Sequence, residues 1–122
     1  MAGKLSAKAQ QRLEILRQGR RKVDRLHGLV EQYASVRPGG GDFAPMISRA
    51  AADVGRLFLG NGFGVMADHA NQMAMLARRG GTTQTKFRGL RELVVHLRGE
   101  LDRAEKAVIA EDAEGGEGES GA

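Results

Sequence analysis

The chain has 122 residues, a length that favours one domain, because two domains of half that size would each lack an adequate core. The absence of cysteine excludes disulfides, thiolate metal sites and a cysteine nucleophile, and no apolar run approaches the length of a membrane span. With 19 basic and 15 acidic residues the net charge is +4, and we expect a soluble cytoplasmic protein without a secretory signal.

The first predicted element is a helix from about Ser6 to Val36. Its apolar residues form one seam with a seven-residue repeat, and Gly19 falls on the same seam, where the missing side chain would admit a close neighbour. The seam consists of Leu16, Val23, Leu26, Val30 and Tyr33. Gly28 lies opposite the seam, where core packing cannot explain a glycine.

A second helix is expected after Pro38 and the glycines at 39–41, with Asp42 as its N-cap. Its spacing of apolar residues predicts one buried face. That face consists of Ile47, Ala50, Ala51, Val54, Leu57 and Phe58. The glycine-rich stretch at 60–64 is expected to break or kink this helix.

A third helix is predicted over about Val65–Arg79, followed by a glycine stop at 80–81 and a threonine cap at Thr82 or Thr83. The buried residues expected in it are Met66, Ala70, Met73, Leu76 and Ala77. The last helix has the clearest pattern, since its apolar spacings alternate between three and four. Those residues are Phe87, Leu90, Val94, Leu97, Leu101, Ala104 and Val108.

These elements predict an all-α protein, an antiparallel bundle of four helices, or of three if the middle one is kinked at 60–64. We expect the bundle to occupy residues 1–110. The last twelve residues, Glu111–Ala122, hold five acids, four glycines and no base, a composition typical of a disordered acidic tail. The tail is either a solubilising end or a competitor of polyanions for the basic faces.

The basic residues carry the main functional signal. All 19 lie in residues 1–110, and Arg17, Arg21 and Arg25 recur every four residues opposite the apolar seam of the first helix. Arginine makes planar, two-pronged contacts with phosphate, and a helix N-terminus beside Lys86 adds backbone donors. The predicted nucleic-acid-binding residues are Arg17, Arg20, Arg21, Lys22, Arg25, Arg78, Arg79, Lys86, Arg88, Arg91 and Arg98.

We expect the protein to bind the backbone of RNA or single-stranded DNA without reading the nucleobases. Surface aromatic residues, on which nucleobases could stack, are scarce. We expect no enzyme activity: no nucleophile motif is present, and His27, His69 and His96 stand alone on separate helices. No catalytic residue, metal site or cofactor is therefore predicted, and no membrane contact.

Two stretches resemble known families. Residues 82–90, TTQTKFRGL, resemble a helix-opening motif of the small helical subunit of multi-subunit CRISPR effector complexes, with Thr83, Lys86, Phe87, Arg88 and Leu90 among the matching positions. This resemblance implies a non-catalytic, all-helical, basic subunit of an antiviral ribonucleoprotein that contacts the backbone of guide, target or displaced strand.

The stretch Ile47–Ala52 together with Gly60 and residues 62–64 resembles the four-helix bundles encoded in ribosomal RNA intervening sequences and shared by retroelement accessory proteins. This second resemblance implies a basic ring oligomer that assists a reverse transcriptase. The leading hypothesis is a structural nucleic-acid-binding subunit, present in several copies and in contact with other protein subunits. The alternative is an oligomeric adaptor whose arginines bind acidic protein surfaces.

Overall fold

A computed structural model describes residues 5–35, 43–79 and 82–121, without the side chains of 35 and 115–121. In these residues the chain forms helices and no strand, which confirms the predicted all-α class. The helices are α1 (Ala7–Ser35), α2 (Phe43–Leu59), α3 (Gly64–Arg78) and α4 (Thr83–Gly121). None of the described helices combines the length and the apolar character needed to cross a membrane.

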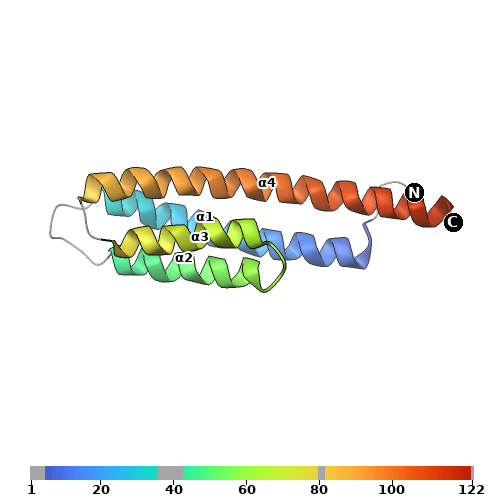
Figure 1. Cartoon of the computed structure of the whole chain (residues 1–122), viewed down its shortest axis with the longest axis horizontal. Coiled ribbons are helices and arrows are strands. Elements are labelled where there is room, and N and C mark those ends of the chain that lie inside the picture. Colours follow the sequence, from blue (N-terminus) through green and yellow to red (C-terminus); the bar gives the residue numbers. More distant parts are fainter. Residues whose placement is uncertain (1–4, 36–42, 80–81, 122) are drawn as a thin grey trace.

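The four helices run alternately up and down the long axis of the molecule (Figure 1). Each helix packs against the next one along the chain, and α4 closes the ring by packing against α1. The longer helices α1 and α4 continue beyond the turn that joins α2 to α3, so one end of the molecule consists of two helices only (Figure 1).

The turn between α2 and α3 decides between the two predicted architectures in favour of four helices. Gly62 has φ of +83°, a left-handed conformation that glycine adopts without steric cost, and the chain reverses there. The backbone N–H of Phe63 donates a 2.9 Å hydrogen bond to the carbonyl of Phe58, and the two rings pack edge to face at 6.2 Å. The predicted break is therefore a tight helical hairpin.

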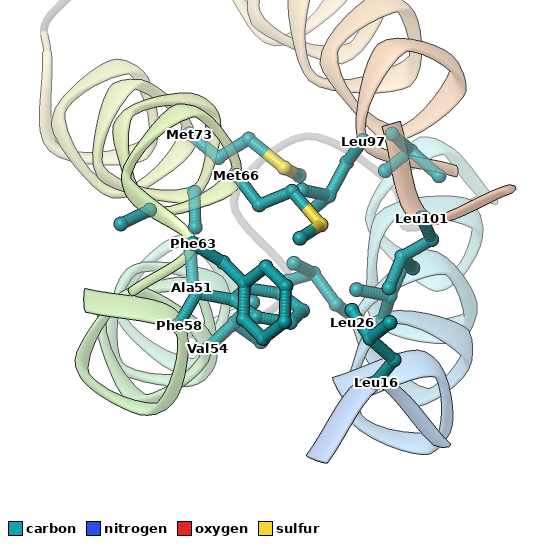
Figure 2. Close-up of a cluster of buried hydrophobic side chains, with 14 of the residues drawn as sticks. Leu16, Leu26, Ala51, Val54, Phe58, Phe63, Met66, Met73, Leu97 and Leu101 are labelled. Atoms are coloured by element: carbon teal, nitrogen blue, oxygen red, sulfur yellow. The ribbon is translucent and has the colours of Figure 1, made fainter. Parts of the chain in front are cut away.

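The predicted apolar seams face a common core. In Figure 2, Phe58 and Met66 of the α2–α3 hairpin point toward Leu16 and Leu26 of α1 and Leu97 of α4. The α1 seam is buried, with Tyr33 half-buried, and the α4 seam is buried apart from its half-buried members Phe87 and Ala104. Burying this apolar surface supplies most of the driving force for folding.

Gly19 of α1 is packed against the ring of Phe58 in α2, as its position on the seam suggested. A Cβ atom at position 19 would lie 2.3 Å from Cζ of Phe58, far inside a normal contact. The glycine therefore lets α2 place its largest core side chain directly against the α1 backbone. Gly28 differs, since it is exposed and a Cβ there would meet nothing within 4 Å.

Side-chain oxygens cap the starts of α1 and α4, and the cap at Thr82 was predicted, whereas the start of α3 at Phe63 has no side-chain cap. Ser6 caps α1 by accepting a 3.1 Å hydrogen bond from the Ala9 N–H, and Thr82 caps α4 by accepting one of 3.2 Å from the Thr85 N–H. The predicted stops at 38–41 and 80–81 and the Asp42 cap lie outside the described residues.

The acidic end of the chain, predicted to be disordered from Glu111, has helical backbone as part of α4 as far as Gly121. Alanine and glutamate are good helix formers, and Asp112 accepts hydrogen bonds from both the backbone N–H and the hydroxyl of Ser6 at the start of α1. This contact joins the start of α1 to the later part of α4.

The substitution Gly19→Ala tests the close contact with Phe58. We expect it to lower the free energy of unfolding by about 1–3 kcal/mol, because overpacking outweighs the helix-propensity gain of about 0.5–1 kcal/mol. Gly28→Ala, on the open side of the same helix, is the matched control and should raise stability by about that gain. Urea unfolding measures both, and equal effects of the two substitutions would contradict the packing account.

The contact between Asp112 and Ser6 predicts a specific pH dependence. Hydrogen bonds from the Ser6 hydroxyl and N–H lower the pKa of Asp112 in the folded state. Its stabilisation is therefore complete above the unfolded pKa of about 3.9 and is lost as the pH falls through the lower folded value. In urea unfolding across pH, the stability advantage of the natural chain over Asp112→Asn should shrink below about pH 4. An advantage that persists unchanged in acid would show that this contact does not titrate.

Candidate polyanion-binding surface

The arginine stripe of α1 lies where the sequence predicted it. Arg17, Arg21 and Arg25 are exposed, on the side of α1 away from its buried seam. Glu14 lies between two of them, 3.8 Å from Arg17 and 3.6 Å from Arg21, in pairs that are open to solvent. Arg25 has no carboxylate partner among the described side chains, so one base of this stripe is unpaired and two share one acid.

Arg20, also predicted to bind nucleic acid, instead joins α1 to α4. Its guanidinium lies 2.7 Å from Asp102 and 3.0 Å from Glu105, and the hydrogen bond to Asp102 is the main cause that raises the pKa of Arg20. Two carboxylates around one guanidinium form a small network, which is worth more than an isolated surface pair. The structure therefore gives Arg20 a role in helix pairing.

Two further predicted bases lie in the same interhelical row. Arg98 pairs with Asp24 at 2.8 Å, and Arg91 pairs with Glu31 at 3.2 Å. In both cases α4 supplies the base and α1 the acid, whereas the direction is reversed at Arg20. Ion pairs in both directions flank the apolar seam and favour one register of the two helices.

Lys22 faces the other neighbour of α1. Its ammonium lies 2.6 Å from a carboxylate oxygen of Asp53 in α2, and this hydrogen bond lowers the pKa of Asp53. Of the predicted binding residues, Arg20, Lys22, Arg91 and Arg98 are thus engaged with acids of a neighbouring helix. The remaining bases are the stronger candidates for an external anion.

Three described bases that lack a carboxylate partner come together at one end of the bundle, whereas Lys8, Arg12, Arg25 and Lys106, also without one, lie along α1 and α4. A hollow of about 440 Å³ opens there between the start of α2, the end of α3 and the start of α4. It is lined by Ala44, Pro45, Ser48, Arg49, Ala77, Arg78 and Lys86. Three helices thus each contribute one base, and none of the described lining residues is acidic. We call this surface the basic hollow.

Local hydrogen bonds hold the walls of the basic hollow in place. The buried hydroxyl of Ser48 donates a 3.1 Å hydrogen bond to the carbonyl of Ala74, which fixes α2 against α3. The ammonium of Lys86 lies 3.5 Å from the carbonyl of Ala77, near the end of α3. That carbonyl orients Lys86 without neutralising it, so the charge stays available to a ligand.

Two exposed arginines extend the positive charge beyond the basic hollow. Arg79 directly follows α3, and Arg88 lies in the second turn of α4; neither has a carboxylate partner among the described side chains. The N-terminal ends of α2 and α4 lie at the same end of the molecule (Figure 1), and their dipoles add to the positive field. This basic end therefore combines five unpaired bases with two positive helix ends.

Arg49 was missed by sequence reasoning. It lies in α2, far along the chain from Arg78 and Lys86, and it belongs to no run of bases. The only sequence signal is its position on the exposed side of α2, next to the predicted buried face. Only the packing of α2 against α3 brings it into the basic hollow.

The prediction that the histidines stand alone was wrong. His69 of α3 and His96 of α4 stack with ring centroids 6.1 Å apart and an angle of 18° between the rings, while His27 lies 3.2 Å from Glu31 one turn along α1. The stacking of His69 on His96 could not be predicted from the sequence, because the two residues lie on different helices. Among the described residues no group of three or more potential ligands is arranged to hold a metal ion.

The chain matches no family model, and neither a curated protein nor a solved structure was found to match it. The assignment of function therefore rests on the geometry and charge of the described residues.

Replacing Arg20 and Arg25 separately by glutamine tests the division between paired and available bases. Arg20→Gln should lower the free energy of unfolding by roughly 0.5–1 kcal/mol, since it removes two interhelical ion pairs. Arg25→Gln, five residues further along the same helix, should change it by less than about 0.5 kcal/mol. Thermal or urea unfolding measures both variants. A larger loss of stability for Arg25→Gln than for Arg20→Gln would contradict the division between paired and available bases.

Proposed function

We propose that the chain is a non-catalytic subunit that binds the phosphate backbone of RNA or single-stranded DNA through its basic end. The observation that carries the proposal is the convergence of Arg49, Arg78 and Lys86 from three helices on the basic hollow, with no acid among the described residues around it. Bases that are held by the fold but not neutralised by it are suited to an external polyanion.

The chemistry of the basic end favours contact with phosphate groups over contact with nucleobases. Two guanidiniums and an ammonium can each donate hydrogen bonds to phosphate oxygens, and guanidinium does so in a planar, two-pronged geometry. Arg79 and Arg88 extend the contact to neighbouring phosphates of the same strand. A site built of donors to phosphate positions a strand without reading its sequence.

The aromatic residues support backbone contact rather than base stacking. Phe58 and Phe63 are buried in the core, and Phe87 is half-buried with the Arg91 guanidinium over its ring at 5.3 Å. Phe43 and Tyr33, the other rings of the chain, are half-buried against the same core. No described aromatic side chain is exposed as a stacking platform, the feature that single-strand binders commonly use.

The outer stripe of α1 provides a second track in this proposal. Arg17, Arg21 and Arg25 are exposed and would contact phosphates beyond the basic end, with Glu14 reducing their field. The paired bases Arg20, Lys22, Arg91 and Arg98 contribute to the overall positive potential more than to direct contacts. We therefore rank the basic hollow first and the α1 stripe second.

We further propose that the chain is one subunit of a larger assembly. Lys86 and Arg88 belong to the stretch that resembles a small CRISPR effector subunit, and both lie at the basic end. This position supports a role as a repeated structural subunit of a ribonucleoprotein. Purification from native cells separates this role from that of an adaptor for acidic proteins: co-purified nucleic acid supports the first, and a nucleic-acid-free protein complex the second.

The triple variant Arg49→Gln, Arg78→Gln, Lys86→Gln tests the basic hollow directly. Fluorescence anisotropy with labelled oligo(dU) and oligo(dT) should show weaker binding to both, because the contact ignores base identity. The plot of log affinity against log salt should lose about two units of slope, given roughly 0.7 per phosphate contact in single strands.

The matched control carries the same charge change on α1, Arg17→Gln, Arg21→Gln, Arg25→Gln. A general effect of net charge would weaken binding equally in both variants, whereas the proposal predicts the greater loss for the basic hollow. Affinity of the natural chain that does not change with salt would overturn the proposal altogether.

A further inference from the structure

The charge of the molecule is polarised along its long axis. The basic hollow, Arg79 and Arg88 lie at the end where α4 begins, and the acidic segment 111–121 lies at the opposite end, where α4 finishes (Figure 1). This segment contains five acids and no base. Glu111 and Glu114 are exposed and unpaired with any described base, whereas Asp112 is occupied by Ser6.

The acidic segment cannot reach the basic hollow of its own chain while α4 is intact. The helix has 39 residues, which at 1.5 Å per residue separates its ends by about 58 Å. Within one molecule of this length, the acidic segment therefore lies too far from the basic hollow to contact it. A second copy has no such restriction.

We propose that the acidic segment of one copy docks into the basic hollow of another, giving a head-to-tail contact between identical chains. Glu111 and Glu114 are three residues apart and share one face of α4, so they present two carboxylates together. The basic hollow offers Arg49 and Arg78 from separate helices as partners for such a pair. Carboxylate and guanidinium match in charge and in planar geometry.

The geometry of this contact has a direct structural consequence. The two surfaces are different and lie at opposite ends of the molecule, so the contact is heterologous, and a bound pair leaves one acidic and one basic end free. Repetition would add copies in a row. Because exposed ion pairs are individually weak and are screened by salt, the assembly should dissociate as salt increases.

Two complementary variants of the full chain test this contact. The hollow variant is Arg49→Gln, Arg78→Gln, Lys86→Gln. The tail variant is Glu111→Gln, Glu114→Gln, Glu117→Gln, Glu119→Gln, and it retains Asp112 so that the contact with Ser6 is kept. Circular dichroism and thermal unfolding first establish that both variants retain the helical fold.

Sedimentation velocity at low salt then gives the oligomeric state. The average mass of the natural chain should increase with concentration and fall to that of a monomer in high salt. Each variant alone should remain monomeric, because one has lost the basic end and the other the acidic end. An equal mixture should form a one-to-one dimer that does not grow further, since only one contact remains possible.

A natural chain that stays monomeric at every concentration would overturn the inference, as would assembly that survives in both variants. The α1 variant Arg17→Gln, Arg21→Gln, Arg25→Gln is the control and should assemble like the natural chain. The result is independent of nucleic-acid binding: a monomeric chain whose basic hollow still binds oligo(dU) contradicts only the head-to-tail contact. Assembly without oligo(dU) binding contradicts only the proposed function.

Discussion

The antiparallel pairing of α1 with α4 is the constraint on which the other features depend. Its apolar seam is flanked by ion pairs that use Arg20, Arg91 and Arg98 together with acids of the opposite helix. These contacts fix the register of the two longest helices, and the α2–α3 hairpin packs against the pair through Phe58 and Gly19. The same contacts determine which bases serve the fold and which remain available to a ligand.

Five bases without a carboxylate partner lie together at one end of the bundle, and no described residue lining the hollow there is acidic. Five bases from α2, α3, α4 and the residue after α3 occupy the basic end, and the acids in contact with bases lie along α1, α2 and the later turns of α4. If these five basic side chains stabilised the fold through ion pairs, acidic side chains would lie beside them. Their lack of carboxylate partners among the described residues, together with the hollow between three helices, is what supports binding of an external anion.

Much of this fold could be predicted from the spacing of apolar residues. The uninterrupted pattern from Phe87 to Val108 and the seven-residue repeat on α1 are properties of single helices, and Gly19 on the seam indicated a close contact. Arg49 in the basic hollow and the stacking of His69 on His96 could not be predicted, because each depends on how two helices pack. The partners of the predicted arginines were missed for the same reason: Asp24 and Arg98 are distant in sequence and adjacent only after the bundle forms. The contact of Asp112 with Ser6 could not be predicted either, because composition does not show which residues meet across two helices.

The central claim is that phosphate is bound at the basic end, and amide chemical shifts measure the position of binding most directly. In a titration of the isotope-labelled chain with oligo(dU), the account predicts the largest shift changes at Ser48, Arg49, Ala77, Arg78 and Lys86, with smaller changes along Arg17–Arg25. Changes that are greatest along α1, or spread evenly over every exposed base, would contradict a specific site at this end of the bundle.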